Sequence, residues 1–138
     1  MLIRPQRKGL MKMKHLEKTY EIEAPLEAVF AALTEEERIA IWSGSPTKME
    51  LHENGQFALW DGGIHGIIRE ITNNRIVQQW KEKKWSNYSI VQFELKENGG
   101  LTILNLTHEN IPDQSFASIR DGWDQYYLGP LKEFCEKK

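Results

Sequence analysis

Hydrophobic and polar residues along the chain follow two different periods, and the order of these segments predicts the fold. Leu16, Tyr20 and Ile22 alternate with polar residues, as in a half-buried strand. In the segment EAPLEAVFAAL (23–33) the apolar positions recur every three or four residues, with Pro25 suited to a first helical position. The first strand is therefore expected to lead into a short amphipathic helix.

A second short helix is expected directly after the first. Thr34 followed by Glu37 has the spacing of a capping box, in which each side chain bonds the backbone of the other. Ile39 and Trp42 form the buried stripe of this helix, and the sequence SGSP (43–46) ends it. The prediction is thus of two small helices after the first strand.

The chain after Pro46 reads as six strands separated by turn sequences such as ENG and DGG. The strand segments are KMELH, QFALW, IHGIIREI, IVQQWKEKKW, YSIVQFELK and LTILNLTH. Strands joined by such short turns pair antiparallel. Val91, Phe93 and Leu95 alternate with polar residues, which gives the sheet one apolar face.

A long helix near the C-terminus is the element expected to cover that face. It begins near Asp113, and its apolar positions are spaced by three and four residues: Phe116, Ile119, Trp123, Tyr126, Tyr127, Leu131 and Phe134. Pro130 lacks an N–H and its ring clashes with the carbonyl of Tyr126 in a straight helix, so a bend is expected at Gly129–Pro130. The fold class is α+β, with a curved antiparallel sheet of about seven strands gripping this helix.

Length and charge indicate one soluble domain. The 138 residues fit a single domain, expected over 14–138, preceded by a disordered leader over 1–13. Residues 1–14 hold five basic and no acidic residues, so the remaining 13 basic and 20 acidic residues give a net charge of −7. An acidic body disfavours binding to nucleic acid, and no apolar run is long enough for a membrane helix.

The cellular compartment is predicted from cysteine usage and from the N-terminal segment. Cys135 is the single cysteine, so an intrachain disulfide is excluded and a reducing cytoplasm is the expected location. The first residues lack the apolar stretch of a secretory signal.

Candidate catalytic chemistry is sparse in this sequence. The four histidines lie on separate expected elements without the paired spacing of zinc sites: His15, His52, His65 and His108. No serine or cysteine has a visible catalytic partner, and NGG and DGG are hairpin turns rather than phosphate loops. The sequence therefore predicts no metal and no cofactor, and a non-enzymatic role is favoured over an enzyme.

Five segments together carry a resemblance to a known family. They are IEAPLEAVFAALTEEERIAIW, GQFALWDGGIHGIIREI, IVQQWKEKKW, LTHENIP and GWDQYYLGPLKEF. In this order and spacing they resemble the C-terminal domain of the activator of heat-shock protein 90 ATPase, a member of the START-related, birch-allergen-like superfamily of helix-grip folds. The resemblance covers roughly 16–137 and implies a cavity between the sheet and the long helix, which in the superfamily often holds apolar small molecules.

Strand alternation and family position together give five candidate cavity residues: Phe57, Ile68, Trp80, Phe93 and His108. The tryptophans and the aromatic stripe of the long helix add Trp42, Trp60, Trp123, Tyr126 and Tyr127. Two alternatives stay open at this point. The aromatic stripe of the long helix is either the lid of a cavity or simply core, and His108 is either a ligand contact or a structural histidine with satisfied hydrogen bonds.

Three functions are compatible with these observations. The first is a cytoplasmic module that binds a small apolar or aromatic molecule under the C-terminal helix. The second, implied by the resemblance, is a co-chaperone-like regulator of a heat-shock protein 90 homologue, for which KEKKW (81–85) is the candidate basic and aromatic surface. The third is an enzyme that uses the same cavity, as some members of the superfamily do.

Overall fold

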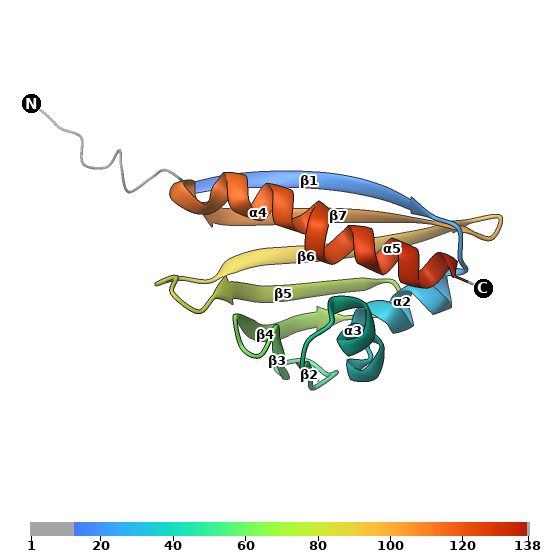
Figure 1. Ribbon diagram of the computed structural model, residues 1–138, viewed down its shortest axis with the longest axis horizontal. Helices are drawn as coiled ribbons and strands as arrows, with labels where there is room; N and C mark the ends of the chain where they lie inside the picture. The colour runs from blue at the N-terminus through green and yellow to red at the C-terminus, as the bar shows by residue number, and fades with distance from the viewer. Residues whose placement is uncertain (1–12, 138) are drawn as a thin grey trace, which may run out of the picture.

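A single antiparallel sheet forms the framework of the molecule (Figure 1). The computed structural model describes residues 13–137, and within them the sheet has seven strands in the order β1-β7-β6-β5-β4-β3-β2. The strands are β1 Met13–Ile22, β2 Lys48–Met49, β3 Gln56–Leu59, β4 Ile64–Ile71, β5 Arg75–Glu82, β6 Ser89–Asn98 and β7 Leu101–Pro112. The first strand and the two-residue β2 are therefore the edges of the sheet.

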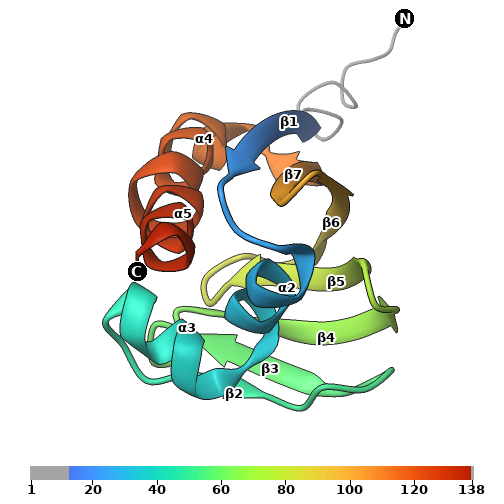
Figure 2. The ribbon, with the colours of Figure 1, turned by 90° about the vertical axis from the view of Figure 1, so that its right-hand side faces the viewer.

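The helices lie together on one face of this sheet, as the two views show (Figures 1 and 2). Two short helices follow the first strand, α2 Leu26–Thr34 and α3 Glu36–Ser43. The C-terminal helix is continuous through η1 Asp113–Ser115, α4 Phe116–Gly122, the π-helical η2 Trp123–Leu128 and α5 Gly129–Glu136. The predicted α+β architecture, a curved sheet covered by a long C-terminal helix, is confirmed.

The inner face of the sheet and the helices share one apolar core. Val91, Phe93 and Leu95 of β6 are at most 1% exposed, as their alternation predicts. The pairing register of β4 with β5 shifts between Ile68 and Glu70, an irregularity of the kind that increases local bending of a strand. The curvature lets the sheet wrap around the C-terminal helix, as the end-on view shows (Figure 2).

The predicted capping box at the second helix is wrong. Thr34 is the last residue of α2, and its hydroxyl donates to the carbonyl oxygen of Phe30 at 2.8 Å. The N-cap position of α3 is Glu35, which makes no side-chain capping bond there. A threonine hydroxyl can donate to the carbonyl oxygen four residues earlier in its own helix, and here that bond is made in place of the cap. The first helix begins at Leu26, one residue later than predicted, because Pro25 is its N-cap and not its first helical residue.

The long helix accommodates Pro130 by a π-helical turn, η2, placed directly before it. The N–H of Gly129 donates to the carbonyl oxygen of Asp124, five residues earlier, which is the π-helical pattern. The sequence led us to expect a bend at Gly129–Pro130, and this wider turn was not foreseen. Widening the turn moves the preceding carbonyls away from the proline ring, so that the helix continues through α5.

Two further expectations concern the ends of the chain and membranes. The predicted disordered leader lies outside the described residues, except for Met13, which begins β1. Within residues 13–137, no helix combines the length and the apolar character needed to cross a membrane.

Candidate functional site

A cavity of about 330 Å³ lies between the C-terminal helix and the part of the sheet formed by β4 and β5. Its helix side comes from α4 and η2, and its sheet side comes from β4, β5 and the turn after β3. Five aromatic side chains line it: Trp60, Trp80, Trp123, Tyr126 and Tyr127. A volume of this size falls at the lower end of small-molecule sites, which are mostly apolar with a few polar groups.

The remaining walls of the cavity add apolar side chains, one gap in the helix surface and one charge. Ile64 and Ile119 contribute apolar surface, and Gly122 leaves room where a side chain would otherwise project from α4. Glu82 supplies a carboxylate from the end of β5. Tyr126 is 63% exposed although it lines the cavity, so the opening lies on its side of the helix.

Four of the five aromatic rings that line the cavity contact one another. The Trp123 and Tyr127 ring centroids are 4.5 Å apart, and Trp80 stacks on Trp123 at 5.5 Å with an interplanar angle of 25°. Trp60 meets Tyr127 edge to face at 5.9 Å. Offset and edge-to-face contacts at these distances are the favourable arrangements for aromatic pairs. The rings of Trp60, Tyr127, Trp123 and Trp80 thus form one continuous aromatic wall.

Trp60 reaches this wall from an unusual backbone conformation. Its φ is 50°, and that of Asp61 is 56°, both in the left-handed region. This region is disfavoured for a bulky residue, and such conformations persist where the surrounding structure holds them. The turn that follows β3 therefore places an indole against Tyr127 at a cost in backbone free energy.

His108 lies behind the aromatic wall and is fully buried, with both ring nitrogens bonded. Trp123 donates its indole N–H to Nδ1 of His108 at 3.0 Å. Ser89 Oγ lies 2.8 Å from Nε2 and donates its own proton to the carbonyl oxygen of Trp80 at 2.6 Å. Because Nδ1 accepts and the serine proton is engaged, His108 is neutral and carries its proton on Nε2.

Burial keeps this histidine uncharged. It lowers the pKa of His108 from the ordinary 6.5 to about 3, because the charged form loses its hydration without gaining an anionic partner. At neutral pH the imidazole is therefore neither a charge nor an available base. It serves as a fixed acceptor that orients the Trp123 indole, which supports the structural alternative weighed from the sequence.

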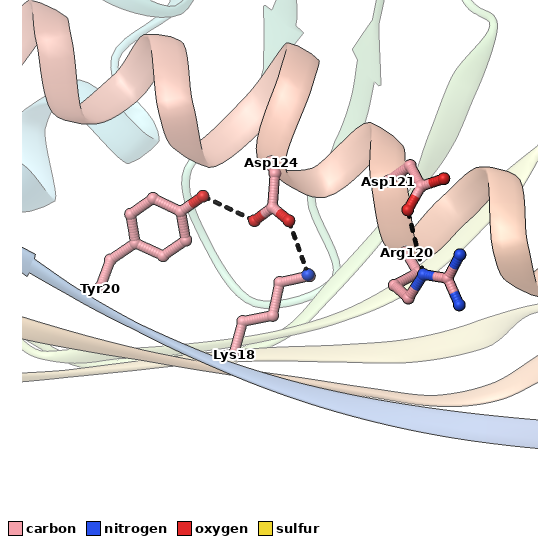
Figure 3. A network of polar contacts seen from close by, with 5 residues as sticks. All are labelled: Lys18, Tyr20, Arg120, Asp121 and Asp124. Carbon is pink, nitrogen blue, oxygen red and sulfur yellow. Dashed lines mark hydrogen bonds and ion pairs between the residues drawn. The ribbon is translucent and has the colours of Figure 1, made fainter.

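A polar cluster on the outer side of the helix fastens the π-helical turn to strand β1 (Figure 3). The Tyr20 hydroxyl donates to Asp124 Oδ1 at 2.6 Å, and Lys18 Nζ donates to Oδ2 at 2.9 Å. Burial by itself raises the pKa of the Asp124 carboxyl, but the bonds from Tyr20 and Lys18 outweigh it and leave that pKa lowered. Asp124 therefore has two roles: its side-chain carboxylate bonds β1, and its backbone carbonyl oxygen accepts the π-helical bond from Gly129.

The structure divides the ten predicted cavity residues into two groups of five. Trp60, Trp80, Trp123, Tyr126 and Tyr127 line the cavity. The others are buried in the core and are not among the described lining residues: Trp42, Phe57, Ile68, Phe93 and His108. Three members of this second group contact the wall from behind, since Trp42 and Phe93 pack on Tyr127 and His108 bonds Trp123. Their role in ligand binding stays a prediction.

Five lining residues were not predicted: Ile64, Glu82, Ser118, Ile119 and Gly122. For Glu82 the sequence contains a signal. Glu82 lies two positions after Trp80, hence on the same face of β5. Ser118 and Gly122 are four residues apart and lie on the same face of the helix. Neither contributes to the apolar pattern, so the sequence does not identify them as lining residues.

The hydrogen bonding of two tryptophan N–H groups, those of Trp85 and Trp80, differs and bears on the KEKKW segment and on the cavity wall. Trp85 is 7% exposed and donates its N–H to Ser115 Oγ at 3.2 Å, so KEKKW does not present an exposed aromatic residue as expected. The strand also ends at Glu82, before this tryptophan. The N–H of Trp80 is buried and has no hydrogen-bond partner among residues 13–137. The cavity wall therefore contains one donor that the described part of the protein leaves unused.

Cys135 does not add a reactive group. Burial, helped by the charge of Glu136, raises the pKa of its thiol to about 11. Since the thiolate is the nucleophilic form, this cysteine is unreactive at neutral pH. Within the described residues, no group of three or more histidine, cysteine, aspartate or glutamate side chains is arranged to hold a metal ion.

The fold and sequence are shared with solved structures. An HSP90 activator from Plasmodium falciparum is 32% identical, with a TM-score of 0.81 over 86% of this chain and 94% of the activator. CalU16 from Micromonospora echinospora is 29% identical, with a TM-score of 0.77 over 89% of this chain and 76% of CalU16. Both similarities extend over most of this chain and so include the cavity-forming elements.

Sequence comparisons lead to the same group of proteins. Activator of 90 kDa heat shock protein ATPase homolog 2 of Mus musculus is 25% identical over 114 residues, which are 80% of this chain but 34% of the mouse protein. The chain spans about a third of the length of the curated relatives it matches. Residues 23–136 match the family described as Activator of Hsp90 ATPase homolog 1-like protein. This chain therefore belongs to the Activator of Hsp90 ATPase homolog 1-like family.

Proposed function

We propose that this protein binds a small, largely apolar molecule in the cavity between its C-terminal helix and its sheet. The observation that carries the proposal is a space of about 330 Å³ lined by five aromatic side chains, four of which form a continuous wall. The opening beside Tyr126 gives a ligand access from solvent.

The chemistry around the cavity supports binding rather than catalysis. His108 is neutral with both nitrogens engaged, so it offers no proton transfer to a bound molecule. Glu82 is the acidic residue of the lining. Aromatic surface with one or two polar groups is typical of sites that hold a molecule by shape and burial.

Filling the cavity from the helix side tests the proposal directly. In Gly122→Leu the added side chain would project toward space that is now open, because a Cβ at this position meets only Tyr126 Cδ2, at 3.9 Å. We expect the affinity for the neutral fluorescent probe N-phenyl-1-naphthylamine, measured by fluorescence titration, to fall about tenfold or more, which corresponds to losing roughly 1.4 kcal/mol of binding free energy.

A leucine placed on the outside of the same helix provides the matched control. Gln125 is exposed and does not line the cavity, so Gln125→Leu adds the same side chain without filling the space. The probe should bind this variant as it binds the unmodified protein. Equal affinities for the unmodified protein and a folded Gly122→Leu variant would refute binding in this cavity.

A second candidate function is regulation of an Hsp90-type chaperone. It rests on one observation: the 32% identical structure that this chain covers over 94% of its length is that of an HSP90 activator. Activity of that protein is not by itself activity of this chain. The exposed turn after β5, with Lys83 and Lys84, is the basic surface to test, because exposed charges can steer and position a partner.

An ATPase assay with the Hsp90 homologue from the same organism checks this candidate. We expect added protein to raise the ATPase rate, and charge reversal at Lys83 and Lys84 to reduce the stimulation about threefold or more, in the range of one charged contact. Charge reversal at the exposed Lys48 and Lys96 changes net charge equally and serves as control. An unchanged ATPase rate at saturating protein would exclude the role.

A further inference from the structure

We infer that the cavity selects a positively charged apolar molecule, such as an aromatic or alicyclic amine, over neutral or anionic molecules of the same shape. This inference rests on the proposed function, since it specifies the ligand class of the same site. Three observations support it. The cavity is lined by aromatic side chains, its single charged lining residue is acidic, and that residue takes part in none of the ion pairs among residues 13–137.

The lining has the composition of a site that attracts cations. Five of its side chains are Trp or Tyr, whose ring faces carry partial negative charge. The Tyr127 ring centroid lies 4.5 Å from that of Trp123 and 5.9 Å from that of Trp60, so three aromatic rings meet at one place on this wall. A cation within about 6 Å of a ring centroid is attracted electrostatically, most strongly to Trp, and more so where water is displaced.

The single charged group of the described lining has the complementary sign. Glu82 contributes a carboxylate, and none of the lining residues in the described part of the chain is Lys, Arg or His. The histidine behind the wall is neutral, so it does not offset this charge. A cationic ligand is therefore favoured by both the ring faces and the carboxylate, whereas an anion is opposed by both.

Glu82 also remains available to a ligand. It takes part in none of the ion pairs found among residues 13–137. Its neighbour Lys81 is engaged elsewhere, donating to the carbonyl oxygen of Trp85 at 2.9 Å with its ammonium 5.3 Å from the Tyr88 ring centroid. A partly exposed carboxylate without a protein cation can pair with a ligand cation at low cost in lost contacts.

The position of Glu82 relative to Trp80 defines the expected ligand more closely. The two residues lie on the same face of β5, two positions apart, so their Cα atoms are about 7 Å apart along the strand. A ligand of one or two fused rings that carries an amine on a short linker would place the rings on the aromatic wall and the ammonium near Glu82. The structure thus points to an arylalkylamine rather than a compact inorganic or fully polar cation.

A matched series of three probes tests the inference. 1-Naphthylmethylamine is a cation at neutral pH, 1-naphthylmethanol is neutral, and 1-naphthoate is an anion, while the ring system is the same. We expect calorimetric titration to show the amine binding about tenfold more tightly than the alcohol, and the carboxylate binding most weakly. The advantage of the amine should shrink as salt is added, because the carboxylate is partly exposed.

The isosteric variant Glu82→Gln separates charge from shape. We expect it to lower the affinity for the amine about fivefold and to leave that for the alcohol unchanged within twofold. Glu94→Gln is the control, because Glu94 is a half-buried carboxylate on β6 outside the cavity and its removal changes net charge equally. This control should bind all three probes as the unmodified protein does.

The outcomes distinguish this inference from the proposed function. Equal affinity for the amine and the alcohol would overturn the inference and leave small-molecule binding in place. An equal loss of amine affinity in Glu82→Gln and Glu94→Gln would also overturn it, because the effect would then come from overall charge. Failure of all three probes to bind would count against the proposed function itself, and the inference would fall with it.

Discussion

Lowering the pH from 7.5 to 4.5 is expected to reduce the free energy of unfolding by about 2.5 kcal/mol through His108 alone. The pKa of this histidine falls from 6.5 to about 3 on folding, because the ring is buried. Between these two values the unfolded chain binds a proton that the folded protein excludes. The stabilisation is therefore complete above the unfolded pKa and is lost, at about 1.4 kcal/mol per pH unit, as the pH falls toward 3.

The measurement is urea unfolding at several pH values for the unmodified protein and for His108→Gln. Glutamine does not titrate, so the difference between the two stability curves isolates the histidine. Asp124, whose lowered pKa also makes stability fall in acid, is present in both proteins and cancels. The variant is expected to be less stable at neutral pH, because Trp123 and Ser89 lose their partner, yet to show the shallower pH dependence. Parallel curves would contradict the assignment of His108 as a buried neutral group.

Replacing Gly129 by alanine is expected to destabilise the protein by roughly 2 to 3 kcal/mol, the range for forcing extra atoms into a packed site. A Cβ at this position would lie 2.3 Å from the carbonyl oxygen of Asp124, which is a backbone atom that accepts the π-helical bond. Relief of the clash requires the π-helical turn to change, and that turn carries Trp123 and Tyr127. Denaturant unfolding measures the loss, and binding of N-phenyl-1-naphthylamine should weaken in the same variant.

Gly122→Ala is the matched control within the same helix. Its Cβ would contact only the Tyr126 side chain, at an ordinary 3.9 Å, and the backbone there is also helical. Alanine is favoured over glycine in a helix by about 1 kcal/mol, so this variant is expected to be slightly more stable. If both alanine variants were stabilised alike, the close approach at Gly129 would not be a constraint on the native protein.

The sheet and its covering helix could be predicted from the sequence because apolar residues recur with the period of a strand in one and of a helix in the other. The alternation of Val91, Phe93 and Leu95 fixes which face is buried, and turn sequences of a few residues fix the antiparallel order. The capping box at Thr34 failed for a different reason. Its hydroxyl can either accept from a backbone N–H at the start of α3 or donate to the Phe30 carbonyl oxygen within α2, and the choice depends on where α2 ends, which tertiary packing decides.

The cavity was predictable in part. Large aromatic residues on the inner faces carry a strong signal, so Trp80, Trp123 and Tyr127 were identified. The volume of a cavity, however, depends on the space that side chains leave empty between the helix and the sheet. Gly122 could be recognised as a lining residue only once the helix is placed over β5. The π-helical turn could not be read from Gly129 and the following proline, because those residues suit a bend equally well.

Both edges of the sheet have features that limit pairing with strands of other molecules. An edge strand offers unpaired backbone groups to any extended chain, and short or charged edges reduce that risk. The β2 edge is only two residues long. At the other edge, the Glu21 carbonyl oxygen accepts from Lys132 Nζ at 2.7 Å, and the N–H of Glu23 donates to Glu136 Oε2 at 2.9 Å. The C-terminal helix thus protects the end of β1 from edge-to-edge aggregation.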